Sequence, residues 1–337
     1  MKTDGREGSI RGVRSDRIFF GSLALVSVLP LIGLPLMGLS LASPALLVIP
    51  AAANLIGLGH VASSAFLYVD DELRPVARRN FWHFTGGLLV VPLGCVVLFQ
   101  ISPTIAAFGT LAFLMWNLHH FQRQNYGLVA LAAASTGFGK LPIRLNRMIN
   151  LVSLAGCLAL LALPTVAPGL GIAMRTAGTI VYIVAGIEFV LLLQSEPRLV
   201  ANRRVLLFTI IGFVFYLPAI LSGDMLAAFW SYGLAHAAQY LMMGGVFSAG
   251  SRKRLVGLAI WLVLALIGLG GLMLVRTSAL LWPLWIAFTI CHFLVDARAW
   301  KLREEPQRSI VRRRFSFLFA PASPVTAPAG NLSLARD

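Results

Sequence analysis

Hydrophobic and polar residues are arranged along this chain in long blocks. Runs of about 20 predominantly apolar residues, the length that crosses the hydrocarbon core of a bilayer, alternate with short polar connections. Ten such runs lie near residues 19–41, 45–69, 81–101, 104–122, 148–167, 174–194, 205–222, 225–248, 255–275 and 278–297. Two apolar stretches, Leu128 to Ala134 and Phe315 to Ala320, are too short to cross a bilayer and predict interfacial segments. The pattern predicts an all-α fold, a polytopic membrane helix bundle with about ten transmembrane helices.

The predicted bundle occupies residues 19–300. A basic segment, residues 1–18, precedes it, and a tail, residues 301–337, follows it. From Pro321 onwards the tail is rich in Pro, Ala and Ser, a composition typical of disorder. Because neither flank predicts a soluble domain, function is expected inside the bundle or at its cytoplasmic face.

The connections between the apolar runs alternate in charge. Those after the first, third, seventh and ninth runs are short and nearly uncharged, whereas the remaining basic connections and both flanks carry clustered Lys and Arg. Of the 28 basic residues, only Arg175 and Arg276 fall on the opposite side of the predicted bundle, which leaves 26 on one side. Basic residues of membrane proteins stay on the cytoplasmic side. We therefore expect both termini inside, in a multi-pass protein of the bacterial inner membrane.

Composition supports this interpretation and excludes other classes. Hydrophobic residues make up 58% of the chain and charged residues only 12%, whereas soluble domains have about 25% charged residues. The net charge of +15 would suggest nucleic acid in a soluble protein. Here the basic residues flank apolar runs, so the expected partner is the lipid bilayer, with no nucleic acid. The three cysteines lie inside apolar runs and predict no disulfide framework.

Apart from His83, which lies at the start of the third run, the histidines lie in four predicted helices that all run in the same direction. Ionisable residues inside membrane helices are costly and mark candidate functional sites, and imidazole is the commonest metal ligand. Glu188 lies at a comparable level of the sixth run. The pattern favours a shared metal site, for which the candidate ligands are His60, His120, His236 and His292, with Glu188 as a candidate fifth ligand.

Neighbouring polar residues extend this candidate site. Only one of His119 and His120 can face it, because adjacent residues on a helix point about 100° apart. Asp296 follows His292 by four residues and shares its face, so its carboxylate can orient that imidazole. Gln239 and Tyr240, which follow His236 by about one turn, are expected to line a substrate pocket by hydrogen bonding. His83, beside Trp82 at the start of the third run, is expected to be an interfacial residue outside the site.

These motifs resemble those of the bacterial and archaeal membrane β-carotene-cleaving dioxygenases. Gly57-Leu58-Gly59-His60 is similar to the Gly-x-Pro-His motif of that family, and His120-Phe121 is similar to its His-Phe-Gly motif. His236 corresponds to the first histidine of its His-x-x-x-His motif, and His292 to its late Pro-His. The resemblance implies a single non-haem iron held by histidines, and it favours His120 over His119 as the inward ligand.

The chain also departs from that family. Gly59 and Cys291 stand where the family has proline, and Tyr240 replaces the second histidine of His-x-x-x-His. The resemblance therefore implies a functionally distinct relative whose metal has one protein ligand fewer.

Together these features predict an integral-membrane oxygenase, with non-haem iron as the expected cofactor and a lipophilic small molecule, such as an isoprenoid or another lipid, as substrate. Tyr240, Gln239 and Asp296 are the residues expected to touch substrate or support the metal ligands. Two other classes stay open. Buried histidines and Glu188 could relay protons or bind an ion in a transporter, and two histidines on different helices could clamp a b-type haem.

Overall fold

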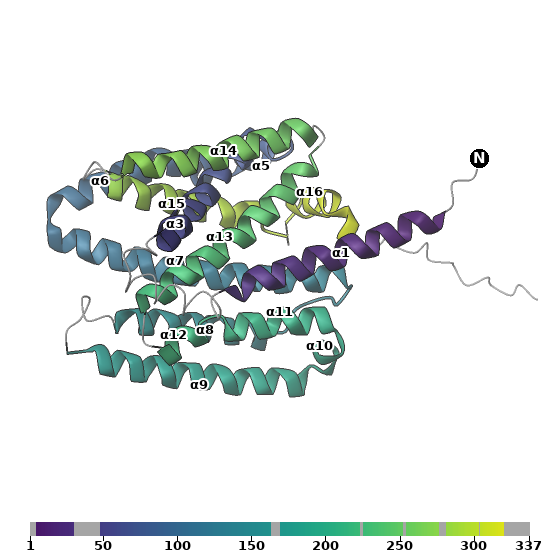
Figure 1. Cartoon of the computed structure of the whole chain (residues 1–337), viewed down its shortest axis with the longest axis horizontal. Coiled ribbons are helices and arrows are strands. Elements are labelled where there is room, and N and C mark those ends of the chain that lie inside the picture. The colour runs from purple at the N-terminus through teal and green to yellow at the C-terminus, as the bar shows by residue number, and fades with distance from the viewer. Residues whose placement is uncertain are drawn as a thin grey trace, which may run out of the picture.

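The structure, a computed structural model, describes residues 5–29, 48–162, 169–222, 225–251, 254–275, 281–302 and 304–319. In these ranges every regular element is helical (Figure 1), which confirms the predicted all-α fold class. Four stretches are long and apolar enough to cross a membrane: Trp82–Ile101, Ile143–Leu161, Gly171–Ser195 and Arg203–Leu221. Two shorter apolar helical stretches are Ile56–Val69 and Arg254–Leu266.

Most helices match the predicted apolar runs. The longer ones are α1 (Gly5–Ser27), α3 (Val48–Ser63), α6 (Gly87–Ile101), α7 (Pro103–Ser135), α8 (Ile143–Leu161), α9 (Gly171–Ser195), α11 (Arg203–Val214), α13 (Met225–Ala249), α14 (Arg254–Val275) and α15 (Leu281–Ala299). The shorter ones are α4 (Phe66–Val69), α5 (Arg74–Arg79), α10 (Pro197–Ala201), α12 (Leu217–Ser222) and α16 (Gln307–Arg314), with the π-helical turn η2 (Trp82–Gly86) and the 3-10 turn η3 (Ser316–Leu318).

The first two predicted spans differ from the observed helices. Instead of starting near residue 19, α1 begins at Gly5, includes the basic N-terminal segment and ends at Ser27. The rest of that span, residues 30–47, lies outside the described residues. The second span is divided at Ser64 and Ala65 into α3 and α4.

The segment from Leu128 to Ala134, which was expected to be a separate interfacial stretch, is the last part of the 33-residue helix α7. The prediction was wrong because the polar residues before it do not end the helix. The Gln122 side chain donates a 2.6 Å hydrogen bond to the backbone oxygen of Gly212 on α11. With such partners the polar residues are accommodated inside the bundle, and Leu128 and Val129 beyond them are buried.

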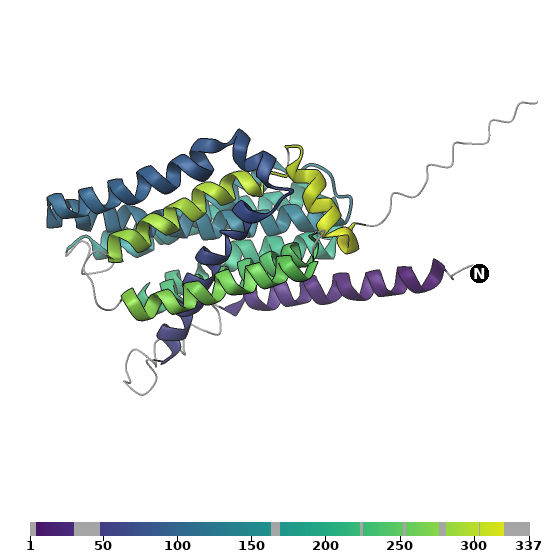
Figure 2. The same cartoon turned by 90° about the horizontal axis from the view of Figure 1, so that it is seen from above.

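The basic connections lie together at one end of the bundle. In both views α1 projects past the other helices at the end where α16 lies, and Figure 1 places α10 at the same end (Figures 1 and 2). Ion pairs join these segments: Arg204 contacts Asp16 of α1, and Arg314 of α16 contacts Asp70 and Glu72 between α4 and α5. This arrangement agrees with the charge alternation read from the sequence.

An extensive apolar core fills this end of the bundle, where α1, α7, α8, α11 and α16 meet. Phe20, Val129, Leu145, Phe208 and Phe315 are among its nearly fully buried members. In contrast, α6 and α9 present apolar side chains outwards, including Leu89 with 69% and Ile172 with 85% of its surface exposed. Outward apolar faces on long apolar helices are typical of contact with lipid.

Candidate metal centre

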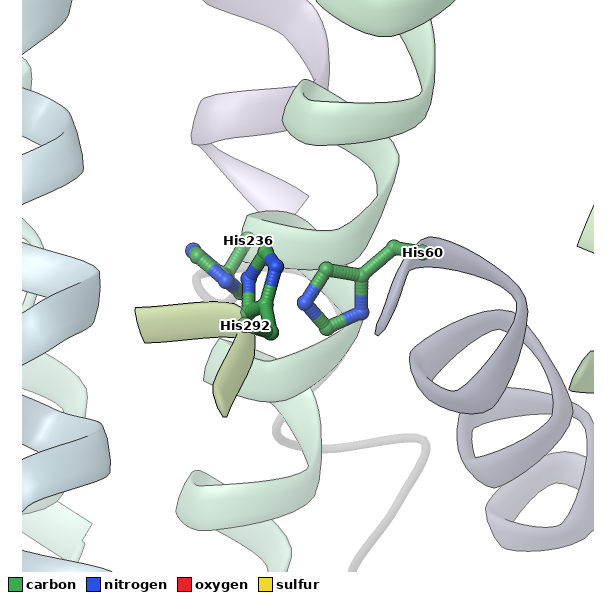
Figure 3. Close-up of side chains that lie close together, drawn as sticks. All are labelled: His60, His236 and His292. Carbon is green, nitrogen blue, oxygen red and sulfur yellow. The ribbon is translucent and has the colours of Figure 1, made fainter. Parts of the chain in front are cut away.

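Four helices bring four histidines into one cluster. The imidazole rings of His60 (α3), His120 (α7), His236 (α13) and His292 (α15) form a closed ring of neighbours. Their ring centres are 4.9 Å apart for His60 and His236, 4.8 Å for His60 and His292, and 4.9 Å for His120 and His236. The centres of His120 and His292 are 5.5 Å apart, and those of His236 and His292 are 6.5 Å apart. Figure 3 shows His60, His236 and His292 converging from three separate helices.

The two adjacent histidines of α7 point in different directions, as helix geometry requires. The ring of His120 stacks on that of Phe293 at 4.0 Å and joins the cluster. His119 turns towards α8, where its Nδ1 lies 3.1 Å from the hydroxyl oxygen of Ser153. The structure therefore places His120, and not its neighbour, among the four.

The cluster is buried, and most of its nitrogens have no hydrogen-bond partner in the structure. His60, His236 and His292 expose 6%, 1% and 2% of their surfaces. Both ring nitrogens of each of these three residues, and Nε2 of His120, are buried without a partner. Leaving a buried polar group unsatisfied costs about 1–3 kcal/mol. Seven such nitrogens in one place are therefore unusual for a purely structural cluster.

The nitrogens lie close enough to share an ion. One ligand atom each from His60, His236 and His292 fall within 4.8 Å of one another, and so do one each from His120, His292 and Asp296. With a metal–nitrogen distance of about 2.0–2.1 Å, neighbouring imidazole ligands have ring centres about 4.6–5.4 Å apart and opposite ones about 6.5 Å apart. The observed ring separations fall close to these values, so His60, His236 and His292 fit a single ion, and His120 lies beside them in a second group that shares His292.

Asp296 and Tyr240 form a pair beside the histidines. The Tyr240 hydroxyl donates a 3.0 Å hydrogen bond to one carboxylate oxygen of Asp296. The other carboxylate oxygen lies 3.5 Å from Nε2 of His292 and 4.0 Å from Nε2 of His120. The ring of Tyr240 packs edge-on against His60 and His292. A carboxylate so placed can fix the orientation of ligand imidazoles.

Gln239, expected in the substrate pocket, lies instead in a chain of buried amides. Its side-chain nitrogen donates to the hydroxyl of Ser27 at 2.7 Å and to the side-chain oxygen of Asn125 at 3.2 Å. Its side-chain oxygen accepts a 2.6 Å hydrogen bond from Gln124. These bonds tie α1, α7 and α13 together. In the sequence, these hydrogen bonds are indicated only by the run of amide residues inside an apolar helix. The sequence does not reveal the partners of those amides.

Glu188 does not belong to the cluster, which corrects the expectation of a fifth ligand. Its two carboxylate oxygens contact Arg144 at 3.1 Å and Arg147 at 2.9 Å, both on α8. A carboxylate held by two guanidinium groups has its charge balanced there. The prediction rested on the depth of Glu188 along its helix, which is similar to that of the histidines. It was wrong because α9 packs on α8, so that Glu188 contacts the arginines of α8 and not the histidines. His83 lies in η2 and belongs to neither group of candidate ligands.

Comparison with models of known protein families finds no match, and comparisons with curated proteins and with solved structures find none either. The resemblance to the carotene-cleaving dioxygenases stays a prediction.

Proposed function

We propose that this chain is an integral-membrane metalloenzyme, a non-haem iron oxygenase that acts on a lipophilic substrate. The convergence of seven buried, unpartnered imidazole nitrogens from four helices supports this proposal most strongly. Ligation of a metal would satisfy one nitrogen of each ring, and several imidazoles with open coordination positions suit iron.

Each residue of the cluster has a distinct role in this proposal. His60, His120, His236 and His292 hold the metal, and Asp296 orients the imidazoles of His292 and His120. A bound non-haem iron would supply the activation of dioxygen. Tyr240 keeps Asp296 in place through its hydroxyl hydrogen bond and presents its ring to His60 and His292. Burial of His60, His236 and His292 limits the access of water to these three ligands.

The arrangement of the rings argues against a haem. Two axial imidazoles need the porphyrin plane between them, and His236 and His292 have a suitable ring separation of 6.5 Å. However, the rings of His60 and His120 each lie within 5.5 Å of both, and so fill the space that a porphyrin would need. A proton or ion pathway through the histidines and Glu188 is also weakened, because Arg144 and Arg147 hold that carboxylate elsewhere.

We further propose the full membrane topology: ten spans with both termini in the cytoplasm. The clustering of the basic connections at one end of the bundle supports it. Single cysteines introduced at Gly223 and Ser251, in a chain whose three cysteines are replaced by alanine, are expected to react from outside and from inside, respectively. Equal labelling of both positions from outside would refute the topology.

Elemental analysis and an absorption spectrum of the detergent-purified protein test the proposed function. We expect iron without a haem Soret band. A Soret band would favour a haem protein, and the absence of any metal would favour transport. Replacement of His60, His236 or His292 by alanine should remove most of the metal, whereas His83→Ala should leave it in place.

A further inference from the structure

One face of α7 leads from the surface of the bundle to the histidine cluster. Trp116, His120 and Arg123 follow one another at spacings of four and three residues, and so lie along one side of the helix. Trp116 is 42% exposed, which is high for a tryptophan beside a buried site. The strip combines an aromatic ring, an imidazole and a cation.

His120 is the member of the cluster that reaches this surface. Its side chain is 13% exposed, compared with 1% for that of His292. The ring of Phe293 on α15 lies between the strip and the cluster, 5.8 Å from Trp116 and stacked on His120 at 4.0 Å. Ring contacts therefore lead from the exposed Trp116 through Phe293 to His120.

Arg123, at the end of this strip, is paired only with neutral groups. Its guanidinium donates a 2.7 Å hydrogen bond to the side-chain oxygen of Asn146 and lies over the ring of Tyr126. Within the described part of the chain, no carboxylate lies at ion-pair distance from it. Arg144 and Arg314, by contrast, contact carboxylates at 3.1 and 2.7 Å. The positive charge of Arg123 is therefore available to an external anion.

The position of Arg123 along α7 matches the edge of a bilayer. The hydrocarbon core is about 30 Å thick, which corresponds to about 20 helical residues. Counted from the start of α7 at Pro103, this length ends near Arg123. His120 then lies about one turn inside the hydrocarbon, at the end of the bundle that carries the basic connections.

We propose that this strip binds an anionic amphiphile from the cytoplasmic leaflet as the substrate of the centre. Its carboxylate or phosphate head group pairs with Arg123, and its apolar chain lies over Trp116 and Phe293, so that a carbon near the head group faces His120. This inference rests on the proposed function and narrows its substrate from lipophilic molecules in general to amphiphiles with an anionic head group.

Photolabelling in lipid nanodiscs tests the assignment. Palmitate carrying a diazirine in its chain is expected to label peptides of α7 and α15 about tenfold more than the matching alcohol, because only the acid forms a charge-assisted hydrogen bond with Arg123. Arg123→Gln should reduce labelling by the acid to the level of the alcohol, and Arg123→Lys should retain most of it. Arg254→Gln, which removes an exposed arginine at the same end of the bundle, is the matched control and should have no effect.

Competition with unlabelled palmitate and with hexadecyl phosphate distinguishes a carboxylate from a phosphate head group. Equal labelling by acid and alcohol, or equal competition by hexadecanol, would overturn the proposal. Labelling is to be measured in both metal-loaded and metal-stripped protein. The proposed metalloenzyme function and the proposed binding of an anionic amphiphile can therefore fail separately. A chain that never holds metal but labels through Arg123 would refute the proposed function. A metal-containing chain that labels equally with both probes would refute the ligand assignment.

Discussion

Replacement of His236 by leucine should stabilise the metal-free protein, although it removes a metal ligand. Both ring nitrogens of His236 are buried without a hydrogen-bond partner, and the residue exposes only 1% of its surface. Without metal, the imidazole therefore contributes an unsatisfied donor and an unsatisfied acceptor to the folded state. Leucine is apolar and of comparable size, so it removes both.

The size of the effect follows from these two groups. Each unsatisfied buried group costs about 1–3 kcal/mol, so their removal recovers about 2–6 kcal/mol. Leucine loses part of the ring packing against Phe121, whose ring centre lies 4.4 Å from that of His236, and such changes of shape cost about 1–3 kcal/mol. Taking the middle of each range, the net gain in the free energy of unfolding is about 2 kcal/mol, which raises Tm by about 4 °C.

Thermal unfolding of the two proteins after metal chelation measures this difference. With excess metal the order should reverse, since ligand at 100 times Kd stabilises the wild type by about 2.7 kcal/mol and has little effect on the variant. His119→Leu is the matched control. His119 is hydrogen-bonded to Ser153, so its loss should not stabilise the metal-free protein. If His236→Leu unfolds below the metal-free wild type, the imidazole is satisfied in the fold and the reasoning is refuted.

Three further substitutions separate the roles of neighbouring residues. Tyr240→Phe should keep the metal stoichiometry, measured by elemental analysis, and reduce turnover, because its hydroxyl supports Asp296; loss of metal would make Tyr240 a ligand. Glu188→Gln should leave metal content unchanged and change the free energy of unfolding little, since its arginine partners are partly exposed; reduced metal content would return Glu188 to the site. Arg314→Met should cost about 3–5 kcal/mol in a denaturant titration, because it leaves the buried carboxylate of Asp70 without its arginine partner. Burial raises the pKa of Glu72, but hydrogen bonds and charge from Arg314 and its neighbour outweigh it and hold that pKa below 4.5. The stability that the Glu72–Arg314 ion pair contributes is present above pH 4.5 and is lost as pH falls through the lowered pKa of Glu72. Arg314→Met should therefore weaken the dependence of the free energy of unfolding on acid pH. An unchanged dependence below pH 4.5 would contradict this role of Arg314.

The sequence was sufficient for the helical class and for most helix positions, because spans of apolar residues between charged connections follow directly from bilayer dimensions. It was less informative where polar residues interrupt an apolar run. The amides of α7 look like a helix end in the sequence, yet Gln122 and Gln124 find partners on α11 and α13, and the helix continues to Ser135.

The candidate site shows the same limit. Depth along each helix could be read from the sequence, and His60, His236 and His292 lie at matching depths. The sequence does not reveal which helices are neighbours, because that depends on tertiary packing. Glu188 has the expected depth but faces α8, and Phe293, which stacks on His120, carries no signal in the sequence.

X-ray absorption spectroscopy of the metal-loaded protein tests whether the four histidines hold the metal, since it reports the ligands of the ion itself. We expect about four imidazole nitrogens near 2.1 Å with the outer-shell scattering of histidine rings, and loss of one such ligand in His120→Ala. A first shell with sulfur, or one made only of oxygen without imidazole scattering, would contradict a metal centre built from these four histidines.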